Sequence, residues 1–205
     1  MIRSPERSVE RDAAIAAMLP HVPFDGWTYR ALRMGLADLG VPTEEAELLF
    51  PGGTRDMLEA FFDWSDRRMA DGVAGLDLST QRLPQRVRAV IALRLAQNRP
   101  HKEAIRRAVA LLTLPLHARL AAVATARTID AIWHAAGDRS TDFSWYTKRA
   151  ILTAVYATTV LYWLRDTSDD DAATLAFLDR RLAGVGLIGV VRRRAETALA
   201  RLRAA

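Results

Sequence analysis

The chain has 205 residues, of which half are hydrophobic and none is a cysteine. Its net charge of +5 lies in residues 177–205, because residues 1–176 hold 22 basic and 22 acidic residues. This length and composition suit one folded domain and exclude a disulfide scaffold, a cysteine-ligated metal site and a thiol nucleophile. Because a protein that coats nucleic acid carries its basic face on the folded body, the neutral body argues against that class and predicts a basic C-terminal segment with a separate role.

Helical periodicity dominates the sequence and strand alternation is almost absent, which predicts an all-α fold. Proline and glycine residues separate the successive helices. Thr43 and Thr54 are the predicted N-caps of the third and fourth helices. We expect helices over residues 9–19, 27–39, 43–50, 55–72, 83–97, 101–112, 116–136, 145–165 and 172–183, followed by a glycine-containing link and a C-terminal helix.

The first three helices have the order and spacing of a helix-turn-helix unit and resemble those of TetR-type repressors. The helix that would enter the DNA major groove, however, carries Glu44, Glu45 and Glu47 and no lysine or arginine. A groove helix usually brings positive charge to the DNA phosphates. The sequence therefore predicts a degenerate helix-turn-helix unit over residues 1–65 that does not bind nucleic acid.

Three patterns resemble functional motifs, but their context favours structural roles. Residues 151–164 are strongly apolar, yet they are shorter than the roughly 20 residues that span a bilayer and predict a buried helix. Residues 184–189 match GxGxxG, but a predicted helix and not a strand precedes them, so they predict a hinge. Asp130 and His134 have the spacing of two metal ligands on one helix, although a surface or capping interaction explains them as well. We therefore expect no enzyme activity, metal or cofactor.

The C-terminal residues predict an amphipathic helix. At about 100° per residue its apolar side chains fall in an arc of about 120°, and arginines flank both edges. Such a helix suits an anionic membrane surface, where arginines reach the lipid phosphates. The same pattern fits a last helix that docks on the protein's own core or on a second subunit. The predicted membrane-binding residues are Leu187, Ile188, Val191, Arg192, Arg193, Arg194, Leu199, Arg201, Leu202 and Arg203.

Residues 137–150, with the sequence GDRSTDFSWYTKRA, are the most distinctive motif in the chain. Their hydroxyl and carboxylate side chains predict a capped helix start. The adjacent Trp145 and Tyr146 cannot both face the core from one helix, so one of them is expected at the surface. An exposed aromatic side chain is typical of a contact site, although a capping turn with two packed aromatic residues is the alternative.

This stretch resembles the Coq-nine family of accessory lipid-binding proteins of ubiquinone (coenzyme Q) biosynthesis. The resemblance rests on residues 137–150, followed by Val155-Tyr156 and by residues 177–181, with residues 133–136 also in place upstream. Residue 144 is serine where many members have asparagine.

The resemblance implies a TetR-like helical bundle with a lipid-binding and dimerisation core over residues 66–183, and a hinge and membrane-binding helix over residues 184–205. The family binds an isoprenoid-type lipid and presents it to a di-iron hydroxylase that acts on demethoxyubiquinone. The resemblance implies that the residues at the family's partner-binding positions of this motif bind the hydroxylase here, namely Asp142, Trp145, Tyr146 and Arg149. Inward positions of the apolar helices give candidate lipid-binding residues Ile132, Leu152, Val155, Tyr156, Thr159 and Trp163.

These observations lead to the hypothesis of a homodimeric non-enzyme that takes a prenylated quinone precursor from an anionic membrane and passes it to the hydroxylase. Residues 1–12 are charged and lack the apolar stretch of a signal peptide. We therefore expect a bacterial, cytoplasmic protein that is peripheral on the inner face of the cytoplasmic membrane. The alternatives are a TetR-type transcriptional regulator with a hydrophobic effector pocket and a lipid-modifying enzyme.

Overall fold

The computed structural model describes residues 6–138 and 144–184, and within these ranges the chain forms helices and no strands. The predicted all-α fold is therefore confirmed, and the predicted helix bounds agree with the observed ones within a few residues. In chain order the elements are α1 (Val9–Met18), α2 (Val22–Asp25), α3 (Tyr29–Asp38), the 3₁₀ helix η1 (Thr43–Glu45), α4 (Ala46–Leu49), α5 (Gly53–Val73), α6 (Leu83–Asn98), η2 (Arg99–His101), α7 (Lys102–Leu112), η3 (Pro115–His117), α8 (Ala118–Ala135), α9 (Ser144–Trp163), η4 (Asp169–Asp171) and a last helix over residues 172–184.

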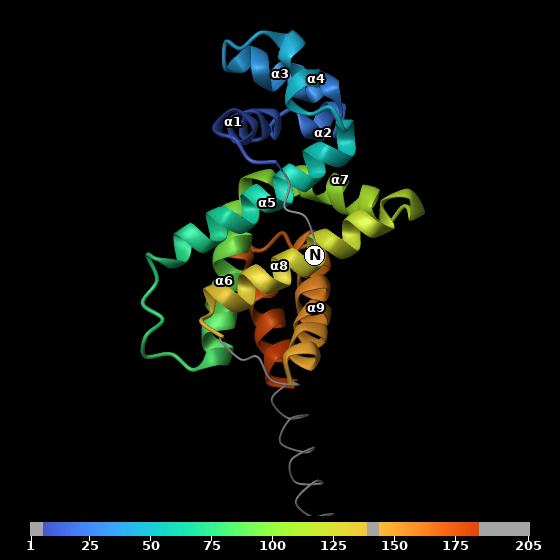
Figure 1. Ribbon diagram of the computed structural model, residues 1–205. Coiled ribbons are helices and arrows are strands. Elements are labelled where there is room, and N and C mark those ends of the chain that lie inside the picture. Colours follow the sequence, from blue (N-terminus) through green and yellow to red (C-terminus); the bar gives the residue numbers. More distant parts are fainter. Residues whose placement is uncertain (1–5, 139–143, 185–205) are drawn as a thin grey trace, which may run out of the picture.

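Helices α1 to α4 form a unit at one end of the molecule, and the long α5 leads from this unit toward α6, α8 and α9 (Figure 1). Within the unit, α1 and α3 approach so closely that a Cβ atom at Gly35 would lie 2.6 Å from the backbone nitrogen of Met18. Ile15, Met18 and Leu32 are fully buried at this crossing. The N-terminal helices therefore have a hydrophobic core of their own, which α5 extends into the body of the protein.

The two predicted N-caps are wrong, because both threonines lie inside their helices. Pro42, and not Thr43, precedes the first turn of η1. Gly52 precedes α5, and the hydroxyl of Thr54 donates a hydrogen bond to the carbonyl of Trp27 at 2.7 Å. The Thr54 hydroxyl thus ties the first turn of α5 to the chain at Trp27. The short α2 has no counterpart among the predicted helices.

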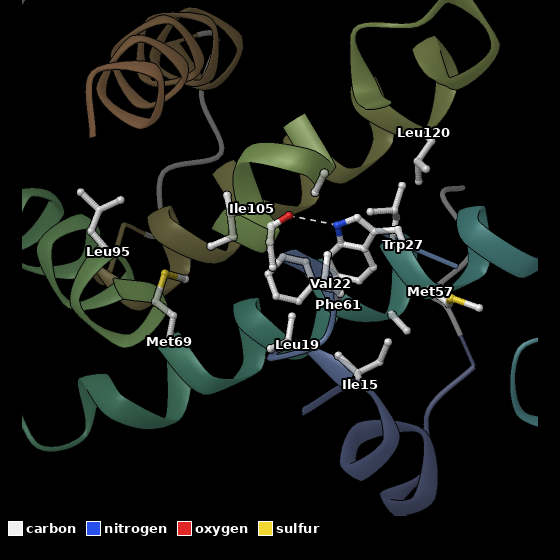
Figure 2. Close-up of a cluster of buried hydrophobic side chains, with 14 of the residues drawn as sticks. Ile15, Leu19, Val22, Trp27, Met57, Phe61, Met69, Leu95, Ile105 and Leu120 are labelled. Atoms are coloured by element: carbon white, nitrogen blue, oxygen red, sulfur yellow. Dashed lines mark hydrogen bonds between the residues drawn. The ribbon is translucent and has the colours of Figure 1, made fainter. Parts of the chain in front are cut away.

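Trp27 lies at the junction between the N-terminal unit and the body. Its ring packs against Phe61 of α5 with ring centroids 5.1 Å apart, and its indole nitrogen donates to the carbonyl of Ala104 in α7 at 3.0 Å (Figure 2). Figure 2 shows Ile15 and Met57 on the same side of this cluster. Because a buried indole N–H needs an acceptor, the bond to Ala104 fixes how the N-terminal unit sits on α7.

Ion pairs attach the start of the chain to α5. Arg7 and Asp63 approach to 2.6 Å, and Arg67 contacts both Asp12 at 2.6 Å and Asp63 at 2.9 Å. Burial alone would raise the pKa of Asp63, but the hydrogen bonds from Arg7 and Arg67 outweigh it and lower the pKa below its ordinary value. The carboxylate therefore stays charged and holds two separate segments together.

The acidic loop after α9 has a structural role. The buried carboxylate of Asp171 contacts Arg99 at 2.9 Å and Lys102 at 3.1 Å, and Asp166 accepts a hydrogen bond from the backbone nitrogen of Thr174 at 2.7 Å. Burial alone would raise the pKa of Asp171, but hydrogen bonds from Arg99 and Lys102 help to lower it below its ordinary value. The loop thereby starts the helix over residues 172–184 and ties it to the α6–α7 connection.

Candidate functional site

A cavity of about 310 Å³ lies among α5, α6, α7, α8 and α9. Sites for small molecules usually have volumes of roughly 300–1,000 Å³, so this cavity falls at the lower end of that range. Its wall consists mainly of aliphatic and aromatic side chains, which favours a hydrophobic ligand. The large apolar side chains of the wall include Phe61, Phe62, Leu95, Ile105, Val109, Val160 and Trp163.

The residues that line the cavity differ in exposure and polarity. Thr113, Ala157 and Leu161 line the cavity and are exposed to solvent, so we call these three residues the mouth. Four other lining side chains are polar and almost completely buried. We call this set, Ser65, Arg94, Asn98 and Thr128, the polar floor.

Arg94 forms the centre of the polar floor. It is only 3% exposed, and its Nη1 atom lies 2.6 Å from Oδ1 of Asp66. Burial raises the pKa of Asp66, and the charge of Arg94 opposes this effect. Burial alone would lower the pKa of Arg94, but Tyr156 and Asp66 outweigh it and the pKa rises. The guanidinium is therefore charged, and its carboxylate partner compensates that charge within the protein.

Hydrogen bonds connect the remaining floor residues. Thr128 donates to Oδ1 of Asp66 at 3.0 Å, Ser65 donates to Oδ1 of Asn98 at 3.3 Å, and Nδ2 of Asn98 donates to the carbonyl of Arg94 at 2.8 Å. The Nε atom of Arg94 donates to the hydroxyl of Tyr156, which lines the cavity from α9, at 2.8 Å. This network joins α5, α6, α8 and α9, so the polar floor also holds the helices of the body together.

The predicted lipid-binding residues divide between two cavities. Tyr156 and Trp163 line the cavity described above. Leu152 and Val155 instead line a second cavity of about 180 Å³, together with side chains from α6, α8 and the helix over residues 172–184. Ile132 and Thr159 are fully buried and belong to the lining of neither cavity. The α9 helix thus presents one apolar stripe to each cavity, which explains the division.

The sequence prediction did not include the polar floor, although a signal for it exists in α6. Arg94 and Asn98 continue the spacing of the buried residues Val87 and Ile91, so all four lie on one face of the helix. A charged residue at such an inward position needs a buried partner. That partner, Asp66, comes from α5 and cannot be found from the sequence of α6 alone.

The distinctive motif lies only partly within the described residues. Asp142 lies outside them, and the structure describes Trp145 only as a backbone position in the first turn of α9. Tyr146 is 73% exposed, which confirms that one of the two adjacent aromatic residues lies at the surface. Nε of Arg149 donates to Oδ1 of Asp130 at 2.5 Å, so this predicted contact residue holds α9 against α8.

The possible metal pair has structural partners. The carboxylate of Asp130 contacts Arg149, while Nδ1 of His134 lies 2.7 Å from the backbone oxygen of Asp130. Within residues 6–138 and 144–184, no group of three or more potential ligands has the geometry for a metal ion. The Asp130 and His134 pattern is therefore a local helix interaction.

Two further predicted surfaces are the acidic helix at Glu44 to Glu47 and the C-terminal amphipathic helix. Glu44, Glu45 and Glu47 are exposed, and Glu47 pairs with Arg33 of α3. All ten predicted membrane-binding residues, from Leu187 to Arg203, lie outside the described residues. In the part of the chain that the structure covers, no single helix has the length and apolarity to cross a membrane, whereas the bent pair Leu83–Leu112 and Pro115–Ala135, at 96°, meets both criteria by length and composition only.

Comparison with known proteins connects this architecture to a family. Residues 118–189 match the sequence model of the COQ9 family. The human protein named ubiquinone biosynthesis protein COQ9, mitochondrial, is 32% identical over 82% of this chain and 55% of its own length. The proteins of the same name from Drosophila melanogaster and Schizosaccharomyces pombe are each 33% identical, over 84% and 80% of this chain and 54% and 65% of their own lengths. The chain therefore spans a little over half the length of most of these relatives.

A solved structure gives independent evidence for the fold. A TetR transcriptional regulator from Nitrosomonas europaea superposes with a TM-score of 0.70 and 22% sequence identity, covering 88% of this chain and 99% of the regulator. At this identity the likeness shows the fold alone, and it confirms the predicted TetR-like bundle. The family resemblance carried by residues 137–150 is also confirmed, so the chain is a relative of the COQ9 ubiquinone biosynthesis proteins that is built on a TetR-like fold.

Proposed function

We propose that this protein is a non-catalytic accessory protein of ubiquinone biosynthesis that binds a prenylated quinone precursor and presents it to the hydroxylase that acts on demethoxyubiquinone. The observation that carries the proposal is the apolar cavity among α5 to α9 in a chain whose relatives are named for ubiquinone biosynthesis. A quinone precursor combines a polar ring with an isoprenoid tail that water rejects. A protein with an apolar cavity can hold such a molecule between membrane and enzyme.

The size of the cavity sets how the lipid is held. Burial of about 200 Å² of tail surface is worth about 5 kcal/mol before the costs of binding are counted, so the tail needs no polar contact. A volume of about 310 Å³ cannot enclose a long prenyl chain. The rest of the lipid therefore extends through the mouth.

The surroundings of the mouth fit uptake from a membrane. Leu161 at the mouth is 54% exposed, and Leu114 and Leu116, which follow the mouth residue Thr113 in the chain, are 47% and 86% exposed. Exposed leucines of this kind suit contact with lipid. Together with the amphipathic helix predicted over residues 187–203, they support binding to the anionic inner face of a bacterial cytoplasmic membrane.

The start of α9 is the proposed contact for the hydroxylase. Tyr146 is exposed there, and the carry-over from the family adds Asp142, Trp145 and Arg149. Because Arg149 pairs with Asp130, its role in this contact is to hold the start of α9 in place. We also propose that the protein acts as a homodimer.

Lipid analysis tests the binding step. We expect mass spectrometry of the purified protein to reveal a co-purifying prenylated quinone or its precursor. Ala157 is an exposed residue that lines the cavity, so Ala157→Trp should block the mouth and remove the lipid. Ala154→Trp is the matched control, because Ala154 is exposed on the same helix and does not line the cavity. Lipid that remains unchanged in Ala157→Trp would show that it binds elsewhere.

Flotation with anionic liposomes tests the membrane step. We expect the wild-type protein to float, and a variant with Arg192, Arg193 and Arg194 all changed to Glu to remain in the dense fraction, because reversal of charge repels the lipid phosphates. Unchanged flotation of this variant would mean that the C-terminal helix packs on protein.

The alternative function is a TetR-type transcriptional regulator, which the fold and the cavity both permit. The exposed acidic residues Glu44, Glu45 and Glu47 oppose it, because DNA phosphates would repel them. Gel-shift binding to its own upstream DNA at physiological salt would favour the regulator. Turnover of demethoxyubiquinone by the protein alone would instead show an enzyme.

A further inference from the structure

The hydroxyl of Tyr156 differs from the hydroxyls of Ser65 and Thr128 in the direction of its hydrogen bond. Ser65 and Thr128 both donate to acceptors within the polar floor. The Tyr156 oxygen instead accepts a bond from Nε of Arg94, which leaves its own hydrogen to donate to another group. Because the donor is a guanidinium, the bond draws electron density from the phenol and strengthens it as a donor.

The charge of the site selects among ligands that could accept this hydrogen. Arg94 and Asp66 lie 2.6 Å apart, so the floor carries a compensated charge and no free cation. A carboxylate or a phosphate would lose its hydration on entry and find no uncompensated positive partner. An uncharged carbonyl oxygen loses less hydration free energy on entry than an anion does, and it can accept the hydrogen bond from the phenol.

We infer that Tyr156 is a head-group-recognising residue that donates a hydrogen bond to an uncharged oxygen, of the quinone carbonyl class, on a lipid that enters the cavity ring first. This inference rests on the proposed lipid-binding function. It places the ring at the polar floor and the isoprenoid tail among the exposed apolar residues of the mouth. Passage to a hydroxylase then requires the lipid to leave the cavity, since the floor residues are buried.

Binding of two probes to two tyrosine variants tests the inference. The probes are a benzoquinone that carries a short prenyl chain and an isoprenoid hydrocarbon of similar size without oxygen, each measured by displacement of a hydrophobic fluorescent dye. Tyr156→Phe removes the hydroxyl and keeps the ring. The matched control is Tyr162→Phe on the same helix, because Tyr162 stacks on Phe177 with ring centroids 4.6 Å apart and does not line the cavity.

We expect Tyr156→Phe to weaken binding of the quinone by about 2- to 13-fold, the range for one net hydrogen bond, and to leave binding of the hydrocarbon unchanged. Tyr162→Phe should change neither. An equal loss for both probes, or no loss for the quinone, would overturn the head-group role while the apolar cavity remains a lipid site. Failure of the wild-type protein to bind either probe would overturn the proposed function as well.

Discussion

The buried pair of Arg94 and Asp66 gives the sharpest prediction about stability. Asp66→Ala leaves the guanidinium of Arg94, which is 3% exposed, without its carboxylate, and it also removes the acceptor of the Thr128 hydroxyl. Loss of one partner of a buried ion pair costs about 3–5 kcal/mol of unfolding free energy. The exposed pair Arg88 and Asp179 provides a matched control, and Asp179→Ala should cost at most about 1 kcal/mol.

The two halves of the buried pair should not be equivalent. An arginine cannot release its proton, whereas a buried carboxylate can take one up. Arg94→Met should therefore destabilise the protein less than Asp66→Ala, because Asp66 then becomes neutral by protonation. Burial raises the pKa of Asp66 in the folded state, so the folded variant binds more protons than the unfolded chain. The stability of Arg94→Met should accordingly fall as the pH rises above about 4, the ordinary pKa of an aspartate.

Urea unfolding followed by circular dichroism measures these differences. The free energies of unfolding are compared at pH 7 for all variants and from pH 4 to pH 7 for Arg94→Met. The double variant Asp66→Leu, Arg94→Met should recover most of the loss, because it removes both charges of this pair and leaves neither partner buried alone. The reasoning is refuted if Asp66→Ala costs no more than Asp179→Ala, or if Arg94→Met costs more than Asp66→Ala.

Two further predictions concern the acidic loop and the N-terminal unit. Because the folded-state pKa of Asp171 is lowered, its contribution is present above its unfolded pKa and is lost as the pH falls through the folded value. Asp171→Asn should therefore lower the melting temperature at pH 7, and the difference from wild type should shrink toward pH 2. Gly35→Ala places a Cβ atom 2.6 Å from Met18 and should cost about 1–3 kcal/mol in the same urea assay. Gly184→Ala, which meets no atom within 4 Å, should be neutral or slightly stabilising. A neutral Gly35→Ala would show that α1 and α3 can separate.

The sequence predicts most of the fold because its helix boundaries have strong local causes. Gly40 and Gly137 both adopt a positive φ, at 69° and 76°, directly after a helix, which is the conformation that glycine reaches most easily. The predicted caps at Thr43 and Thr54 are wrong because η1 begins at Thr43 and α5 begins at Gly53, one and two residues before the starts that the local capping pattern predicts. The four-residue α2 is too short to show a periodicity of its own.

The candidate site is less predictable because it depends on how helix faces meet. Tyr156 and Trp163 lie in one cavity and Leu152 and Val155 in another, although all four are apolar positions of α9. Periodicity predicts that such residues face inward, but it does not distinguish two inward faces of one helix. Their neighbours on α5, α6 and α8 decide which cavity each residue lines.

The polar floor links ligand recognition to stability, and this link limits which residues can change. Arg94, Asp66 and Thr128 join α5, α6 and α8, so substitution of any one leaves a buried polar group without its partner. Tyr156 belongs to the same network but is uncharged and lies on α9, so its replacement by phenylalanine keeps the buried ion pair and removes only the acceptor of the Nε atom of Arg94. A change at residue 156 should therefore cost about 1–3 kcal/mol for one unpaired donor, whereas loss of one partner of the ion pair should cost about 3–5 kcal/mol and alters the ligand site and the packing of the body together.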